Sequence, residues 1–489
     1  MTSTSRLATG SAGLDEILHG GFVAERNYMF RGPAGSGKTI LGFHFLEAGV
    51  ENGETALFIN LEEDLDDLRT NAAALGFDTD AIEFLDLSPS AEAFTEDDSY
   101  DIFGAAEVEQ EPLTSEIVDA VAAVDPDRVV VDPLTQLRYL VADDYQFRKQ
   151  VVGFMRYLKQ QGATAVFTVQ NTRELPTEDL EFIADGTIKL EAAAYGRTIT
   201  VPKFRGSTTR SGEHAYRITD DGIRVFPILE PSDHTADFPS KQLSSGISEI
   251  DDLLHGGLER GTVTVVSGPT GVGKTTAATA FLSTAAANGQ TAIAYLFEES
   301  LEMFTQRSET FGYPITDQRE SGSLYVDAVD SLSNSPEEFA HRVRTHVEEN
   351  DAEMVVIDGI AGYKTAIKGD ENGVGLRRRL QALTQYLTNM NVSVILIDQR
   401  NDVMGLPQAT SENVSYIADN IIFQNYIELE GDLQRIVGVL KKRLGGFETV
   451  PRRYRITGDG LEVGEPVTGI HGVFEGIPQR TDGATRSSE

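Results

Sequence analysis

The chain has 489 residues, contains no cysteine and carries a formal net charge of −36 at pH 7. A chain of this length with 40% apolar residues can bury two hydrophobic cores, and the lack of cysteine excludes disulfides, thiolate metal sites and cysteine nucleophiles. The negative charge argues against a non-specific nucleic-acid binder, because such binding depends on neutralising phosphates.

Short apolar runs rich in β-branched residues alternate with helical patterns along the chain. The first half predicts, in order, a strand over 27–30, a glycine-rich loop, a helix over 40–50, strands over 55–59 and 128–132, a helix over 145–161 and a strand over 164–169. The second half predicts corresponding strands over 263–267, 291–297, 354–358 and 392–398. Such strands are buried on both faces, which predicts an α/β fold with a mainly parallel sheet flanked by helices in each half.

An internal repeat divides the chain. Residues 9–21 (TGSAGLDEILHGG) recur as 245–257 (SGISEIDDLLHGG), and Tyr216–Thr219 near the end of the first copy is matched by Tyr454–Thr457. A duplicated domain follows from these matches. We predict a first domain over 1–230, a linker over 231–241, a second domain over 242–465 and a flexible C-terminal tail over 466–489.

Two glycine-rich loops match the phosphate-binding P-loop pattern, GPAGSGKT at 32–39 and GPTGVGKT at 268–275. Their glycines let backbone N–H groups converge on phosphates, and the following helix adds its N-terminal dipole. A strand before each loop, a helix after it and the second copy argue against a chance match. The predicted ATP-binding residues are Gly32, Gly35, Ser36, Gly37, Lys38 and Thr39, and Gly268, Gly271, Val272, Gly273, Lys274, Thr275 and Thr276.

Lys38 and Lys274 are expected to bridge the β- and γ-phosphates, and Thr39 and Thr275 to bind Mg²⁺. Asp132 and Asp358 each end an apolar strand downstream of a P-loop, where a carboxylate can hold Mg²⁺ through a bound water. The alternative for each aspartate is an ordinary strand end that starts a turn.

Paired glutamates follow the second strand of each half. Glu62 and Glu63, and at the matching place Glu298 and Glu299, are expected at the carboxyl edge of the sheet, where ligands of such sheets bind. A carboxylate there can orient the attacking water or hydroxyl or accept its proton, so these four are the candidate catalytic residues. In so acidic a chain the alternative is a solvated surface pair, which the recurrence disfavours.

Two basic segments stand out because basic residues are scarce. Lys203 and Arg205, and likewise Lys441 and Arg443, lie two apart and would face the same side of a strand. From one subunit they could reach the ATP of the next, as an arginine finger does, and head-to-tail contacts of that kind close into rings. The alternative is a local salt bridge to the chain's own acidic surface.

Together these motifs, spread over about residues 6–465, resemble the KaiC family, RecA-superfamily ATPases known from the cyanobacterial circadian clock and widespread in archaea. The resemblance rests on the duplicated entry segment, the paired P-loops, the glutamate pairs and the Lys-x-Arg segments. It implies two tandem RecA-like P-loop NTPase domains, ATP and Mg²⁺ as ligands, a homohexameric ring with ATP at subunit interfaces, and slow hydrolysis. In clock members it also implies autophosphorylation within the second ring.

The family's phosphoacceptor region falls on residues 409–416. Ser415 matches the acceptor serine and Thr410 a nearby threonine implicated in phosphate shuttling, whereas Tyr416 stands where the clock protein has its acceptor threonine. The resemblance therefore implies Ser415 and Thr410 as candidate phosphoacceptors and speaks against a two-site cycle. The alternative is a serine that is never phosphorylated.

The remaining expectations come from composition. No apolar run is long enough to span a bilayer and segment 1–10 lacks an apolar signal region, so we expect a cytoplasmic protein with neither membrane nor nucleic-acid partner. Lysine is scarce beside arginine and acidic residues are spread along the whole chain. This favours a halophilic host, since molar salt shortens the Debye length to about 3 Å and screens self-repulsion.

The leading functional prediction is Mg²⁺-dependent ATP hydrolysis in both halves, with serine/threonine autokinase activity in the second, used in signal transduction. The alternative is a nucleotide-switched regulatory module whose turnover is incidental. An acidic segment, 93–112, has no counterpart motif in the second half and could dock a regulatory protein or be a solvated loop. A DNA recombinase is disfavoured by the charge, the duplication and the lack of a basic arm.

Overall fold

A computed structural model of the chain describes residues 5–89, 111–140, 144–170, 178–193, 196–231, 241–330, 335–366, 374–400, 414–429, 431–468, 470–471 and 479–480. The chain divides into two compact units, Met1–Ile228 and Leu229–Glu489. Among the described residues, no helix is long and apolar enough to cross a bilayer.

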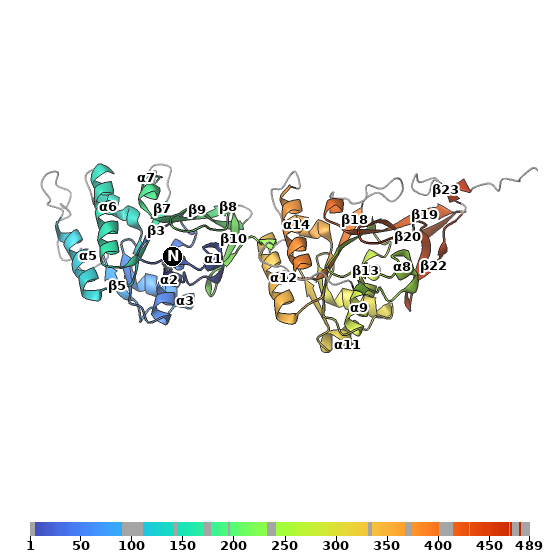
Figure 1. Ribbon diagram of the computed structural model, residues 1–489. Helices are drawn as coiled ribbons and strands as arrows, with labels where there is room; N and C mark the ends of the chain where they lie inside the picture. Colours follow the sequence, from blue (N-terminus) through green and yellow to red (C-terminus); the bar gives the residue numbers. More distant parts are fainter. Residues whose placement is uncertain are drawn as a thin grey trace, which may run out of the picture. The chain divides into compact units, whose positions relative to one another are not determined.

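The first unit is built on a nine-stranded mixed sheet (Figure 1). Along the sheet the strands are β5 (Glu83–Asp86), β4 (Ala56–Asn60), β6 (Arg128–Asp132), β7 (Thr164–Gln170), β3 (Asn27–Gly32), β8 (Gly186–Ala193), β9 (Gly196–Phe204), β10 (His214–Thr219) and β11 (Gly222–Phe226). The pairs from β5 to β8 are parallel, and those from β8 to β11 are antiparallel. The antiparallel strands come last in the repeat and extend the sheet beyond the P-loop strand β3.

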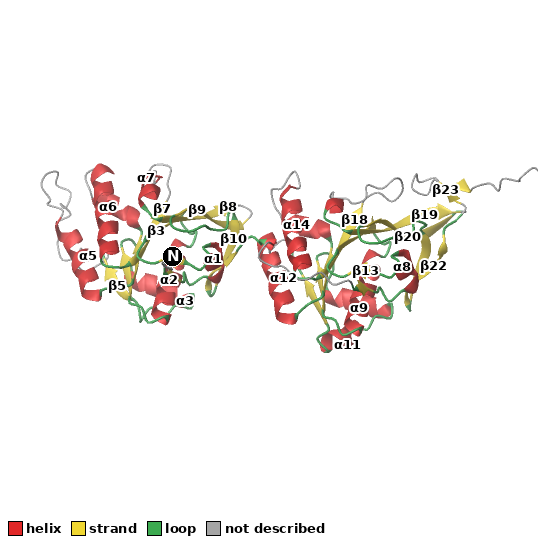
Figure 2. Cartoon of the chain, viewed as in Figure 1, coloured by secondary structure: helices red, strands yellow, loops and turns green. Residues whose placement is uncertain are grey.

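Helices cover both faces of this sheet (Figure 2), and alternate residues of each strand face opposite layers. Phe30 and Phe58 belong to a core that includes residues of α1 (Ala12–Ile17), α2 (Lys38–Glu51) and α3 (Leu65–Ala74). Met29 and Leu57, one residue away, belong to a second core with residues of α5 (Glu111–Val124), α6 (Asp144–Gln160) and α7 (Glu178–Ile183). Burial on both faces explains why the parallel strands are continuous apolar runs.

The second unit repeats this topology in the same order. Its strands are β16 (Leu324–Ala328), β15 (Ala292–Leu296), β17 (Met354–Asp358), β18 (Ser393–Arg400), β14 (Val263–Pro269), β19 (Asn420–Leu429), β20 (Asp432–Lys442), β21 (Arg452–Thr457) and β22 (Gly460–Pro466). One face packs on α8 (Ser248–Leu253), α9 (Lys274–Ala287), α10 (Leu301–Thr310) and α11 (Ile315–Glu320). The other packs on α12 (Pro336–Asn350), α13 (Ile360–Ala366) and α14 (Val374–Asn389).

Several short elements lie outside the two nine-stranded sheets. Two-stranded ladders are formed by β1 (Arg6–Leu7) with β2 (Phe22–Val23), by β12 (Gln242–Leu243) with β13 (Leu258–Glu259), and by β23 (Ile470–His471) with β24 (Gln479–Arg480). The 3₁₀ helices are η1 (Leu134–Leu140) and η3 (Val414–Tyr416). The strands of the first two ladders flank the repeated segments 9–21 and 245–257.

The predicted fold class is confirmed: both halves contain a mainly parallel mixed sheet flanked by helices. The strands predicted over 128–132 and 354–358 match β6 and β17 residue for residue. The domain limits, the linker over 231–241 and the flexible tail stay predictions. Residues 93–110 of the acidic segment lie outside the described residues, as does Thr410.

Candidate functional site

Each P-loop connects a buried strand to a buried helix, β3 to α2 in the first unit and β14 to α9 in the second. Gly37 and Gly273, the residues before these helices, have φ values of 92° and 113°, which side-chain-bearing residues rarely adopt. A Cβ on Gly37 would lie 2.7 Å from Ile223 Cδ1, and one on Gly273 would lie 2.6 Å from Ile456 Cδ1. The glycines therefore allow both the backbone turn and close packing against the final hairpin of each repeat.

The P-loop lysines fold back over their own loops. Lys38 Nζ donates to the carbonyls of Gly32 and Pro33 at 3.1 and 3.0 Å, and Lys274 Nζ donates to the carbonyl of Pro269 at 2.9 Å. Both side chains are buried, with 6% and 7% of the residue exposed. Burial lowers the pKa of each lysine. A phosphate at the loop would give each buried ammonium an anionic partner that the carbonyls do not supply.

Nearby carboxylates oppose the lowering of the lysine pKa values by burial. The charges of Asp132 and Glu62 raise the pKa of Lys38, and the charges of Asp358 and Glu298 do the same for Lys274. In both units, therefore, the lysine, the strand-ending aspartate and the first glutamate of the pair lie close enough to interact. The structure brings these predicted residues together at the carboxyl edge of each sheet, where doubly wound proteins bind ligands.

The strand-ending aspartates accept hydrogen bonds from the threonines predicted to bind Mg²⁺. Thr39 bonds to Asp132, and Thr275 bonds to Asp358. The Thr168 hydroxyl also donates to Asp132. Burial is the main cause that raises the pKa of both aspartates, and it raises the pKa of Asp358 to about 6. An ionised carboxylate in such a place needs a nearby cation.

The two members of each glutamate pair have different surroundings. Burial raises the pKa of Glu63, and the charges of Asp132 and Glu62 raise it further. Burial also raises the pKa of Glu299, but Arg307 donates to its carboxylate at 2.8 Å and opposes the rise. The second glutamate of each pair is thus coupled to residues around the site, while the first interacts with the P-loop lysine.

A tyrosine hydroxyl from the final hairpin of each repeat hydrogen-bonds to the P-loop of that repeat, a contact that the sequence analysis did not predict. We call these two contacts the tyrosine braces. Tyr216 of β10 donates to the carbonyl of Ser36 at 2.7 Å, and Tyr454 of β21 donates to the carbonyl of Val272. Burial raises the pKa of both tyrosines, which keeps the hydroxyl protons in place. The signal was present in the sequence, because both tyrosines belong to the repeated Tyr-Arg-Ile-Thr segment.

Ser36 and Val272 occupy the same place in the two loops and are fully buried. The Ser36 hydroxyl has no hydrogen-bond partner among the residues that the structure describes. Because an apolar valine takes the same place in the second loop, the side chain at this position packs in the interior and makes no required hydrogen bond. Each residue can meet a ligand only through its main chain.

The first basic segment is turned toward its own subunit. Lys203 Nζ donates to the carbonyls of Glu181 and Phe182 at 2.6 and 3.1 Å, and an Arg205 nitrogen lies 3.7 Å from an Asp185 carboxylate oxygen. The two cations thus bind the end of α7 and the residues after it, where a helix dipole favours positive charge. They lie on the same side of the chain, as their spacing predicts.

The second basic segment repeats this arrangement next to a candidate phosphoacceptor. Lys441 Nζ donates to the carbonyls of Ser415 and Ala418 at 3.1 and 2.6 Å, and Arg443 lies 2.8 Å from an Asp419 carboxylate oxygen. Ser415 is half-buried on η3. The Arg205–Asp185 and Arg443–Asp419 contacts are local salt bridges of the kind that the sequence analysis gives as the alternative, whereas both lysines bind backbone carbonyls.

The arrangement fits a nucleotide with a divalent cation. The first N–H groups of α2 and α9 have no partner within their helices, and the N-cap residue of each helix is a glycine, which offers no side-chain cap. Such an end attracts phosphate. Within the described ranges no group of three or more His, Asp or Glu side chains could hold a metal. A threonine hydroxyl with a nearby carboxylate suits Mg²⁺, which retains waters and shares phosphate oxygens.

Comparisons with known proteins agree with this geometry. A family model described as the KaiC ATPase matches residues 7–230 and 243–468. The chain is 26% identical over 490 residues to a circadian clock oscillator protein KaiC of Prochlorococcus marinus strain MIT 9313, covering 97% of this chain and 96% of that protein. It is 27% identical over 494 residues to a circadian clock protein KaiC3 of a Synechocystis strain, covering 97% and 95%.

Proposed function

The chain belongs to the KaiC family of ATPases, and from this premise we propose that it binds Mg·ATP in both halves and hydrolyses it at both, in the service of signalling. The observation that carries the proposal is the duplication of one set of groups. A P-loop lysine, a threonine–aspartate hydrogen bond and a glutamate pair lie at matching places in the two sheets. Decay of one site would be expected to remove at least one of these groups.

In this proposal the P-loops bind the phosphates. Backbone N–H groups at the start of α2 and α9 contact the phosphate oxygens, and Lys38 and Lys274 exchange their loop carbonyls for the β- and γ-phosphates. Mg²⁺, when bound, neutralises charge that develops on the phosphates. Thr39 and Thr275 would hold it through their hydroxyls, with Asp132 and Asp358 orienting a coordinated water.

The glutamate pairs handle the attacking water. We assign proton acceptance to Glu62 and Glu298, because these are the members whose charges act on the P-loop lysines. A water oxygen forms a bond to the γ-phosphorus, the bond from that phosphorus to the bridging oxygen breaks with its electron pair on ADP, and the water proton passes to the glutamate. Glu63 and Glu299 then tune that carboxylate through their own charge.

The wider assembly is also part of the proposal. A homohexameric ring would let Lys203 and Arg205 exchange their bonds at the end of α7 for the ATP of the next subunit, with Lys441 and Arg443 acting likewise. Ser415 is the proposed autophosphorylation site, because its main chain is held by Lys441 from that basic segment. Regulatory proteins would read the phosphorylated or nucleotide-bound state.

The experiment that tests the proposal follows phosphate release and intact mass together. The purified full chain is incubated with Mg·ATP in molar KCl. Phosphate release with an added mass of about 80 Da mapped to Ser415 or Thr410 supports an ATPase that is also an autokinase. Release without added mass keeps the ATPase and removes the autokinase. ATP binding with neither signal would replace the enzyme by a nucleotide-driven switch.

Matched variants separate the two halves. Glu62→Gln and Glu298→Gln should each remove the phosphate release of one half while nucleotide binding persists, because the amide keeps the shape and loses the base. Glu25→Gln, at an exposed position in the loop before β3, is the control for the loss of one negative charge. Wild-type turnover in the double variant Glu62→Gln with Glu298→Gln would remove these residues from the mechanism.

A further inference from the structure

The sheet of the second unit ends in β16, which pairs in parallel with β15 on one side only among the described strands. The Ala292 amide donates to the Ser323 carbonyl at 3.0 Å. Along β16 from this bond, the main-chain N–H and C=O groups of successive residues point alternately toward β15 and away from it. The main-chain groups of Tyr325 and Asp327 therefore face β15, whereas those of Val326 face outward. An edge of this kind can pair with another extended chain.

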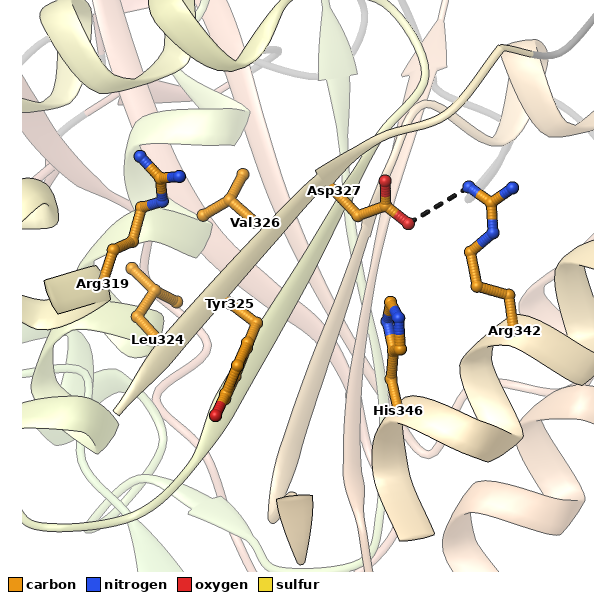
Figure 3. A pocket seen from close by; sticks show the side chains of 7 residues that line it. All are labelled: Arg319, Leu324, Tyr325, Val326, Asp327, Arg342 and His346. Carbon is orange, nitrogen blue, oxygen red and sulfur yellow. Dashed lines mark hydrogen bonds and ion pairs between the residues drawn. The ribbon is translucent and has the colours of Figure 1, made fainter. Parts of the chain in front are cut away.

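A groove of about 480 Å³ follows this edge and has walls from both layers of the unit (Figure 3). On one side of β16 lie Arg319 of α11 and the apolar side chains Leu324 and Val326, and on the other lie Tyr325 and, from α12, Arg342 and His346. Tyr325 is 39% exposed, which is high for a large ring. The edge strand thus forms the floor of a groove with cationic walls and some apolar surface.

This layout suits an added strand better than a small anion. The side chains of a strand point alternately to the two faces of its sheet, so a strand paired with Val326 would direct successive side chains toward the Arg319 wall and the Arg342 wall in turn. The two arginines lie on opposite sides of β16 in Figure 3, so each would face a different side of an added strand.

The first unit lacks this set of residues at the matching edge. In the equivalent register of β5, Glu83 takes the place of Tyr325, and Leu85, which packs against the core, takes the place of Asp327. Counted back from the strand-ending aspartates, Glu116 takes the place of Arg342. The Tyr325, Asp327 and Arg342 side of the groove is therefore not repeated in the first unit, where a cation beside the edge strand is Arg69, over the ring of Phe84.

The charge of the groove indicates its partner. In a chain of net charge −36, the groove is lined by two arginines and one carboxylate, so the charged residues of its lining carry a net positive charge. Asp327 binds Arg342 at 3.2 Å, and the charge of Arg319 acts on Glu302, so carboxylates offset part of the positive charge on both walls. We propose that the outer edge of β16 docks an extended acidic segment of a partner protein, which adds to the sheet as a further strand.

The test uses the full chain and a fluorescent heptapeptide, Glu-Val-Asp-Val-Asp-Val-Glu, titrated by anisotropy at fixed KCl. Saturable binding is expected, and it should weaken at least tenfold in Val326→Pro, which removes an outward N–H while the bonds to β15 remain. Arg319→Ser should also weaken it, whereas Arg224→Ser, the loss of an exposed cation on β11 of the first unit, should not. Unchanged far-UV circular dichroism and ATP turnover verify that Val326→Pro folds.

Two N-methylated peptides supply a signature specific to strand addition. One carries methyl groups on the valine amides and the other on the amides of the acidic residues, so in a paired strand only one of the two sets faces β16. One peptide should bind as tightly as the parent and the other at least tenfold more weakly.

Three results would overturn the proposal. Equal affinity of the two methylated peptides would exclude pairing with the strand. Displacement of the parent peptide by millimolar inorganic phosphate would make the groove a small-anion site. A change of oligomeric state in Val326→Pro, with peptide affinity unaltered, would make this edge a contact between copies of the chain.

Discussion

Protonation of Asp358 is predicted to weaken Mg·ATP binding by the second half below pH 6. Burial raises the pKa of this carboxyl to about 6, with the charges of Glu299 and Glu298 adding to the rise and the Thr275 hydrogen bond opposing it. Mg²⁺ favours the ionised form, so protons compete with it. With a pKa of about 6, roughly one molecule in eleven is ionised at pH 5, and the affinity should fall about tenfold between pH 7 and pH 5.

The assay needs the second site alone. Lys38→Ala disables nucleotide binding in the first half, and a fluorescent ATP analogue is then titrated at saturating Mg²⁺ and constant KCl from pH 5 to pH 7.5. The terminal phosphate of the nucleotide titrates near pH 6 as well, so its contribution must be removed. Asp358→Asn in the same background retains the nucleotide's own pH dependence and lacks that of the carboxyl.

The comparison of these two profiles decides the matter. The affinity with Asp358 intact should exceed that of Asp358→Asn at pH 7 and approach it at pH 5. Parallel profiles, with the same ratio of affinities at every pH, would refute the reasoning, because they would mean that this carboxyl does not titrate between pH 5 and pH 7 or does not act on the bound cation.

Three further predictions follow from the same region. Tyr454→Phe removes the hydrogen bond from this hydroxyl to the second P-loop and should lower the unfolding free energy of the second half alone by about 1 kcal/mol. Tyr216→Phe should do the same to the first half. Calorimetric transitions of the two halves that move equally in either variant would contradict this. Arg307→Ala removes the partner that lowers the pKa of Glu299, so the acidic limb of second-half ATP turnover should move to higher pH, and an unmoved limb would separate this pair from turnover. Without Mg²⁺, Asp358→Asn should stabilise the second unit at pH 7 by up to about 3 kcal/mol, from about two pKa units at 1.36 kcal/mol each. The sign follows from a folded pKa above the unfolded 3.8: the penalty is absent below pH 4, grows between pH 4 and pH 6 and is complete above it, so urea unfolding at pH 4 should show little difference.

The sequence predicted those parts of the fold whose signal is local or repeated. β6 and β17 are apolar runs that end in aspartate, and each P-loop is a contiguous pattern. The repeat then placed Glu62 and Glu298 at equivalent strand ends. These predictions needed only strand burial and the rule that parallel strands end at a common edge.

Contacts between distant segments could not be predicted in this way. That Lys203 binds the end of α7, or Lys441 the carbonyl of Ser415, depends on how loops return to the sheet, which no periodicity encodes. The rise in the pKa of Asp358 depends on its burial by several elements at once. The groove beside β16 arises where α11 and α12 approach one edge, and only the folded chain brings Arg319 and Arg342 to that edge.

The tyrosine braces have a consequence for the synthesis of the chain. Tyr216 lies 180 residues after Ser36, and Tyr454 lies 182 residues after Val272, so each P-loop is translated long before the hydroxyl that supports it. A nascent chain that stops before Tyr216 carries the whole glycine loop but lacks its support. Domains that fold in order of translation would therefore complete the first ATP pocket while much of the second is still unmade. The two pockets are thus completed one after the other during translation, each when the last hairpin of its own repeat has been made.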